Sequence, residues 1–165
     1  MTLLVAYASK HGSTQGIAEA IGKRLRERGL DAEVRPVREV DGLERYDAVV
    51  LGSAVYLGAW LKEATAFLDR HEEALRRVPL WLFSSGPTAP DQGMDLAVST
   101  KTQQRLGELG AHDHHLFRAA LDAKELSFLE RTAIKAAKQP LGDFRDWSDI
   151  ERWADSIAEL AAERS

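Results

Sequence analysis

The chain has 165 residues, 44% of them hydrophobic and 29% charged, which is typical of one soluble globular domain. It contains no cysteine, so disulfides, thiolate metal sites, iron–sulfur clusters and cysteine nucleophiles are excluded. The formal net charge of −4 argues against a nucleic-acid partner, because binding to phosphates needs a basic surface. The N-terminal residues lack the pattern of a signal peptide, and no apolar run approaches the roughly 20 residues of a membrane span. We therefore expect a cytoplasmic protein without a transmembrane segment.

Short apolar stretches alternate along the chain with amphipathic ones. Strands are predicted at residues 3–8, 31–37, 46–52, 78–84 and 112–117. Helices are predicted at residues 13–28, 60–75 and 94–109, and a last helix at a capping box of Ser148 and Glu151. The buried face of this last helix would contain Trp147, Ile150, Trp153, Ile157 and Leu160. The alternation predicts an α/β domain whose parallel sheet is covered by helices on both faces.

The loop after the first strand has the chemistry of an anion site. Residues 9–14 supply hydroxyls, a glycine and several amides directly before a helix. Amides and hydroxyls at a helix N-terminus donate hydrogen bonds to anions, and the helix dipole favours negative charge there. The alternative is that Gly12 or Ser13 simply caps the helix.

Two later loops would lie at the same edge of the sheet, where ligands of such folds bind. Residues 52–60 are mostly apolar and favour a flat, apolar partner, with Tyr56 as the stacking candidate. The alternative is that Tyr56 and Trp60 pack beneath the loop, which is the expected fate of Trp60. Residues 84–93 could donate to the polar edge of a ring, with Asp91 and Asp95 close by.

Residues 7–14, Tyr-Ala-Ser-Lys-His-Gly-Ser-Thr, resemble the phosphate loop of the flavodoxins. The ends of the third and fourth predicted strands also resemble the segments with which flavodoxins contact their flavin. The resemblance implies a flavodoxin-like three-layer sandwich with a five-stranded parallel sheet in the order 2-1-3-4-5. It also implies one domain over residues 1–165, with an insertion-like segment at about 118–145, and non-covalently bound FMN.

The resemblance carries over cofactor-binding residues, but no catalytic side chain and no metal ligand. For the phosphate loop they are Ser9, His11, Gly12, Ser13 and Thr14. For one face of the isoalloxazine they are Ser53, Ala54, Val55, Tyr56 and Gly58. For its other edge they are Ser84, Ser85 and Gly86.

Residues 52–56, 126–131 and 142–147 are similar to the branch of the family that includes menaquinone-dependent protoporphyrinogen dehydrogenase. This similarity implies an oxidoreductase that passes electrons from a porphyrinogen-type substrate to a quinone. Two alternatives stay open, an FMN electron-transfer shuttle and a non-enzymatic binding module that has lost its flavin. The net charge of −4 is milder than that of shuttle flavodoxins, which argues against a dedicated shuttle.

The segment 118–145 fits the strand–helix alternation poorly. Leu126, Leu129, Ala133 and Ala137 form a helical stripe, which we expect to pack as a small subsidiary core over the fifth strand. The alternative is a helix that faces a partner or a membrane surface and meets a quinone. A metal site at residues 112–115, which contain three histidines, is not expected, because no further ligand follows at a familiar spacing.

Overall fold

The computed structural model describes residues 1–86, 93–122, 124, 126–136 and 140–164. Its central parallel sheet contains β1 (Thr2–Ala8), β2 (Asp31–Pro36), β3 (Ala48–Tyr56), β5 (Leu80–Ser85) and β6 (Asp113–Phe117). The strands lie in the order β2-β1-β3-β5-β6, which is the predicted order 2-1-3-4-5 when these five are numbered in sequence. The predicted flavodoxin-like fold class is confirmed.

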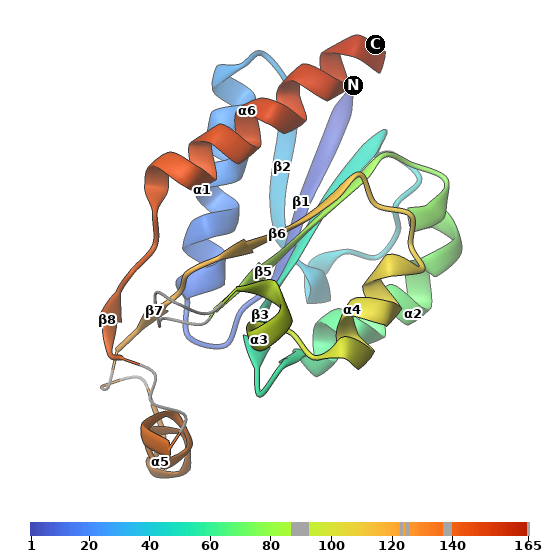
Figure 1. Ribbon diagram of the computed structural model, residues 1–165. Coiled ribbons are helices and arrows are strands. Elements are labelled where there is room, and N and C mark those ends of the chain that lie inside the picture. Colours follow the sequence, from blue (N-terminus) through green and yellow to red (C-terminus); the bar gives the residue numbers. More distant parts are fainter. Residues whose placement is uncertain (87–92, 123, 125, 137–139, 165) are drawn as a thin grey trace.

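Helices cover both faces of this sheet, so the fold has three layers (Figure 1). Helices α1 (Ser13–Glu27) and α6 (Trp147–Arg164) lie on one face, and α2 (Lys62–Arg76) and α4 (Thr100–Gly107) lie on the other. The apolar run of β1 explains why both faces are covered. Leu3 and Val5 belong to one core cluster, Leu4 and Ala6 to the other, and all four are 0% exposed.

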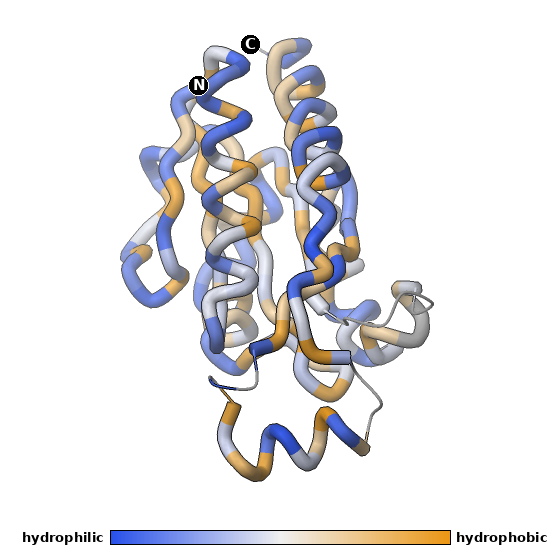
Figure 2. Tube along the Cα trace, turned by 90° about the vertical axis from the view of Figure 1, so that its left-hand side faces the viewer, coloured by the Kyte–Doolittle hydropathy of each residue, from blue (hydrophilic) through white to orange (hydrophobic). Residues whose placement is uncertain are grey.

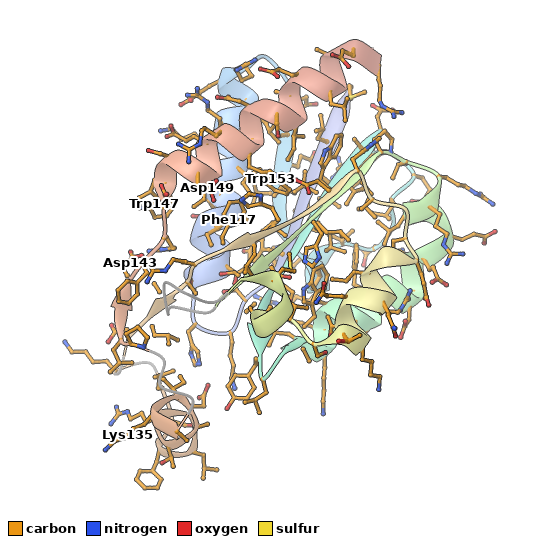
Figure 3. All side chains as sticks on the ribbon, in the orientation of Figure 1. Phe117, Lys135, Asp143, Trp147, Asp149 and Trp153 are labelled. Atoms are coloured by element: carbon orange, nitrogen blue, oxygen red, sulfur yellow. The ribbon has the colours of Figure 1, made fainter. Side chains whose placement is uncertain are left out.

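The edge strand β6 is held to α6 by aromatic packing. The rings of Phe117 and Trp153 lie 5.5 Å apart, edge to face, and Trp153 Nε1 donates to Asp113 Oδ2 at 2.8 Å (Figure 3). His115 packs against both rings, and its Nε2 lies 3.0 Å from Asp149 Oδ2. This aromatic cluster packs α6 against β6, the edge strand that pairs only with β5 in the sheet.

Strand β3 is longer than predicted. It continues to Tyr56 and turns back through β4 (Ala59–Trp60), so the apolar segment predicted as a loop is a β-hairpin. Trp60 belongs to β4, and α2 begins only at Lys62, which corrects the predicted helix over 60–75. Trp60 is buried, as expected, because its indole packs beneath the hairpin.

The predicted helix over 94–109 is two helices, α3 (Met94–Ala97) and α4, separated at Val98 and Ser99. Ser99 Oγ accepts a hydrogen bond from Thr102 N at 3.2 Å and so starts a new helix inside the predicted one. Because the apolar periodicity continues across Val98 and Ser99, the sequence pattern gave no indication that the helix is interrupted there.

The capping box predicted at Ser148 and Glu151 is wrong. Helix α6 begins at Trp147, and Asp146 caps it, because Asp146 Oδ1 accepts from Asp149 N at 3.1 Å. Trp147 was predicted to be buried, but its side chain is 43% exposed and lies against the guanidinium of Arg145 (Figure 3). Ile150, Trp153 and Ile157 form the buried face as predicted.

The segment predicted as an insertion contains a short antiparallel ribbon, β7 (Ala120–Leu121) with β8 (Gly142–Asp143), and helix α5 (Phe128–Ala136). Helix α5 lies beyond the end of the sheet and has no buried residue (Figures 1 and 2). Leu126 is buried, but Phe128 and Leu129 are 81% and 78% exposed, so the expected subsidiary core is not formed by the described residues. Ala137 lies outside the described residues.

The remaining element is a short 3-10 helix, η1 (Val37–Glu39), between β2 and β3. In the described part of the chain, no helix has the length and apolar character needed to cross a membrane.

Candidate functional site

A cavity of about 470 Å³ opens beyond the carboxyl ends of β1, β3 and β5. Its walls come from the loop after β1, the β3–β4 hairpin, the end of β5, residues 97–99, residues 119–121 and α5. Its volume and position are those of a small-molecule site in an open α/β sheet.

Most of the sequence-predicted site residues line this cavity. They are Ser9, His11, Ser13, Thr14, Ala54, Val55, Tyr56, Gly58, Ser85 and Gly86. Gly12, Ser53 and Ser84 do not line it. Gly12 borders a separate, shallower hollow, and the other two are buried side chains that support the walls. Asp91 and the side chain of Asp95 lie outside the described part of the chain.

The first loop presents hydrogen-bond donors to the cavity. Thr14 is 1% exposed, and its Oγ1 has no hydrogen-bond partner among the described residues. The first-turn amides of α1 have no intrahelical acceptor. Ser9 Oγ accepts from Gly12 N at 3.1 Å, and Ser13 Oγ accepts from Ala120 N at 2.9 Å, so each hydroxyl keeps its own hydrogen for a ligand. Such a set of donors favours an anionic ligand.

Gly12 shapes the entry to this helix. Its φ of 85° is in the left-handed region, and a Cβ there would meet open space, so the backbone angle is what favours glycine. Gly12 is the N-cap residue of α1 and Ser13 is the first residue of the helix, so of the two capping candidates Gly12 takes that position.

The β3–β4 hairpin forms another wall. Its turn has φ values of 51° at Leu57 and 82° at Gly58, as a two-residue hairpin turn with both central residues left-handed requires. Ser99 N donates to Gly58 O at 2.9 Å and fixes the tip. The half-buried ring of Tyr56 lines the cavity, and Lys10 Nζ lies 5.0 Å from the centre of that ring.

The buried side chains of Ser53 and Ser84 support the β3–β4 hairpin through hydrogen bonds. Ser53 Oγ accepts from Leu61 N at 3.1 Å and donates to Ala54 O at 2.8 Å. Trp60 Nε1 donates to Ser84 Oγ at 2.8 Å, and Ser84 Oγ lies 2.7 Å from His114 Nε2. Because an indole only donates, Ser84 Oγ accepts from Trp60, and the direction of its hydrogen bond with His114 depends on which ring nitrogen of His114 carries the hydrogen.

His114 is a neutral member of this chain of hydrogen bonds. Burial lowers the pKa of His114 from 6.5 to about 4, because the charged imidazolium would lose its hydration. The other histidines of the segment have different partners, since the ring of His112 lies 5.1 Å from that of Trp81 and His115 pairs with Asp149. Within the described ranges, no group of three His, Cys, Asp or Glu residues could hold a metal ion.

At the end of β5, a buried hydroxyl faces the cavity. Ser85 is 2% exposed, and its Oγ finds no hydrogen-bond partner in the part of the chain that the structure describes. The Gly86 amide, in contrast, donates to Phe117 O at 2.9 Å and is already used. Among Ser84, Ser85 and Gly86, the described residues predicted for the polar edge of a ring, the Ser85 side chain therefore offers the free donor.

Sequence reasoning missed Glu130, which reaches the cavity from α5. Its Oε2 accepts from His11 Nε2 at 2.7 Å and from Lys10 Nζ at 3.0 Å. Ser127 and Glu130 form a capping box, since Ser127 N donates to Glu130 Oε1 and Glu130 N to Ser127 Oγ, both at 3.2 Å. The hydrogen bonds from His11 and Lys10 lower the pKa of Glu130 to about 2.

Further lining residues were not named in advance: Lys10 and Leu57 belong to the predicted loops, and the others are apolar or lie outside those loops. These further lining residues are Lys10, Leu57, Leu61, Ala97, Ser99, Ala119, Ala120, Leu121, Leu126, Ala133 and Ile134. The capping-box spacing of Ser127 and Glu130 was visible in the sequence, but it indicates a helix start and says nothing of which loop the carboxylate would meet.

The family model described as Flavodoxin domain matches residues 4–148. The chain belongs to this family. The domain implies flavin binding, usually of FMN, and the loop that resembles a flavodoxin phosphate loop is the one that carries the free Thr14 hydroxyl.

A curated relative aligns over almost its full length and is named for its activity. The chain is 28% identical over 174 residues to protoporphyrinogen IX dehydrogenase [quinone] of Escherichia coli strain K12, covering 97% of this chain and 96% of the relative. This similarity agrees with the branch suggested by the sequence motifs. A protein of the same name from Escherichia coli O157:H7 matches equally.

Solved structures confirm the fold. A flavodoxin from the domain Archaea superposes with a TM-score of 0.63 at 20% identity, covering 97% of this chain and 98% of that one. Rubredoxin oxygen:oxidoreductase from Desulfovibrio gigas gives a TM-score of 0.65 at 15% identity. It covers 96% of this chain but only 35% of that one, so the flavodoxin-like fold occurs there as part of a longer chain.

Proposed function

We propose that the protein is an FMN-dependent oxidoreductase that oxidises a small redox substrate of the porphyrinogen type and passes the electrons to a quinone. The observation that carries the cofactor assignment is the pair of buried, unpartnered hydroxyls of Thr14 and Ser85 in one cavity of the described chain. A buried hydroxyl without a partner costs free energy, so its retention is best explained by a ligand that supplies the acceptor.

The described residues fit FMN. Ser9, Ser13, Thr14 and the first-turn amides of α1 would hold the phosphate. Val55 and Tyr56 would cover the ring with apolar surface, and the Ser85 hydroxyl would meet its polar edge. When bound, FMN supplies the redox chemistry, and the protein supplies binding, orientation and exclusion of water.

The enzyme proposal, rather than a shuttle, is supported by the walls that the insertion adds. Leu126, Ala133 and Ile134 line the cavity opposite the hairpin, so the site has an apolar side beyond the family's flavin loops. An apolar wall fits a second flat ligand, such as a porphyrinogen or a quinone. The relative at 28% identity is named as a dehydrogenase of protoporphyrinogen IX that uses a quinone.

We further propose that the protein is cytoplasmic and contacts a membrane surface through α5 to reach a lipid-soluble quinone. Phe128 and Leu129 are exposed side by side, and Lys135 projects outward from the same helix (Figure 3). Exposed apolar side chains with a basic residue are typical of helices that lie at the interface of anionic membranes.

Two measurements test the function. The purified protein is first saturated with FMN, desalted, and its visible absorbance recorded; retained flavin bands are expected. The flavin-loaded protein is then given reduced porphyrin with a menaquinone analogue, and separately a reductant with cytochrome c. Porphyrin oxidation that requires both FMN and quinone supports the enzyme. Rapid cytochrome c reduction without porphyrin turnover would instead indicate an electron shuttle, and a protein that retains no FMN would contradict the cofactor assignment.

A further inference from the structure

Glu130 is the one acidic side chain among the described residues that line the cavity. Its carboxylate contacts the loop after β1, residues 9–14, whose other polar groups can donate hydrogen bonds. Only 13% of its side chain is exposed, and it accepts from both Lys10 and His11. A carboxylate therefore already uses two of the donors at the place where the fold favours an anionic ligand.

The carboxylate is ionised, and this fixes the direction of the hydrogen bonds. An ionised carboxylate can only accept, so His11 Nε2 carries the hydrogen that lies between it and Glu130. A ligand phosphate in the same loop would be a second anion close to Glu130. The two anions would repel each other in a partly desolvated site and compete for Lys10 and His11.

Glu130 also ties α5 to the rest of the molecule. Helix α5 has no buried residue, and Glu130 makes polar contacts with Lys10 and His11 of the first loop. The capping box with Ser127 fixes the carboxylate to the start of the helix. Loss of the contact with His11 and Lys10 would consequently free the end of α5 that lies over the cavity.

We propose that Glu130 is the charge-selecting residue of this site. In the absence of a ligand phosphate its carboxylate neutralises the first loop and strengthens the contact of α5 with it, so that a bound phosphate and the Glu130 contact weaken each other without excluding each other. This inference rests on the proposed FMN function. Thermodynamic linkage makes this effect reciprocal. The free energy by which the Glu130 contact weakens phosphate binding equals the free energy by which a bound phosphate weakens the contact of α5 with the loop.

The test compares Glu130→Gln with the parent protein in fluorescence titrations with FMN and with riboflavin, which carries the same ring without a phosphate. We expect Glu130→Gln to tighten FMN about tenfold, because one negative charge is removed beside the phosphate. Riboflavin affinity should change less than about twofold. Glu163→Gln is the matched control, because it removes the same charge from an exposed position near the C-terminus, far from α5 (Figure 1).

Limited digestion by trypsin provides a second readout. Cleavage after Arg131 and Lys135 should accelerate when FMN, but not riboflavin, is added to the parent. In Glu130→Gln it should be fast without any ligand.

The outcomes separate this inference from the proposed function. If the parent retains no flavin, the proposed function fails and the inference fails with it. If the parent binds FMN and Glu130→Gln binds it equally or more weakly, only the inference is overturned. If Glu130→Gln raised riboflavin affinity as much as FMN affinity, the effect would act through the flavin ring and not through the phosphate charge, and the inference would be overturned. Protection of α5 from trypsin by FMN would also overturn it, because bound phosphate would then strengthen the contact of α5.

Discussion

Replacing Thr14 by valine should have opposite effects on the ligand-free and the FMN-bound protein. Thr14 is 1% exposed, and its hydroxyl has no partner in the described chain, while valine has the same shape. Removing an unsatisfied buried hydroxyl should raise the free energy of unfolding of the ligand-free protein by about 1 kcal/mol. The same change deletes a hydrogen bond to a charged phosphate, worth about 1.5–3 kcal/mol, so FMN should bind about 10- to 150-fold more weakly.

Urea unfolding of the ligand-free protein, followed by tryptophan fluorescence, measures the first effect, and FMN titration measures the second. Thr65→Val is the control, because the Thr65 hydroxyl has a partner, Lys62 O at 3.0 Å, outside the cavity. It should not stabilise the protein, and it should leave FMN affinity unchanged. A Thr14→Val protein that is less stable than the parent, or that binds FMN as tightly, would refute the assignment of this hydroxyl to a ligand.

Three further outcomes are expected. The folded-state pKa of His114, about 4, lies below the ordinary 6.5, so stability is fully present above pH 6.5 and falls by on the order of 3 kcal/mol as the pH drops to 4. Urea unfolding at several pH values should show this loss in the parent and its reduction in His114→Gln; an unchanged slope would contradict it. Gly52→Ala should destabilise by about 1–3 kcal/mol in the same assay, because a Cβ there would overlap the fully buried Phe83 ring, and a neutral effect would mean that this ring can move. The double variant Phe128→Ser, Leu129→Ser should lose co-sedimentation with anionic vesicles while retaining FMN, and equal sedimentation of parent and variant would argue against membrane contact through α5.

The alternation of strands and helices was accessible from the sequence because it rests on local patterns, whereas the order of the strands in the sheet was implied by the resemblance to the flavodoxins. The continuous apolar run in β1 signals a strand covered on both faces, and the helices that follow it carry one apolar stripe each. The residues of the first loop are adjacent in sequence, so their shared place at a helix N-terminus could also be inferred. These predictions agree with the folded structure because each depends on residues only a few positions apart in the sequence.

Predictions failed where a contact between distant segments decides the outcome. The hydroxyls of Ser53 and Ser84 support the hairpin through Leu61, Trp60 and His114, which the sequence did not indicate, while their contact with a flavin stays a prediction. The start of α6 was misplaced because a good N-cap residue, Asp146, lies just before the predicted box. Leu129 fits an apolar stripe, but α5 lies beyond the sheet and leaves it exposed.

By itself, the sequence determined an α/β domain with a parallel sheet and a loop rich in hydrogen-bond donors after the first strand, because these follow from periodicity and from local hydrogen-bonding chemistry. The order of the strands was implied by the resemblance to the flavodoxins. Only the tertiary structure decided which hydroxyls remain free and which residue faces the loop. His11 and Glu130 are 119 residues apart in the chain, and the return of α5 to the first loop brings them within 2.7 Å. Helical periodicity describes one element at a time, whereas the charge balance of this site depends on two elements packed across the carboxyl edge of the sheet.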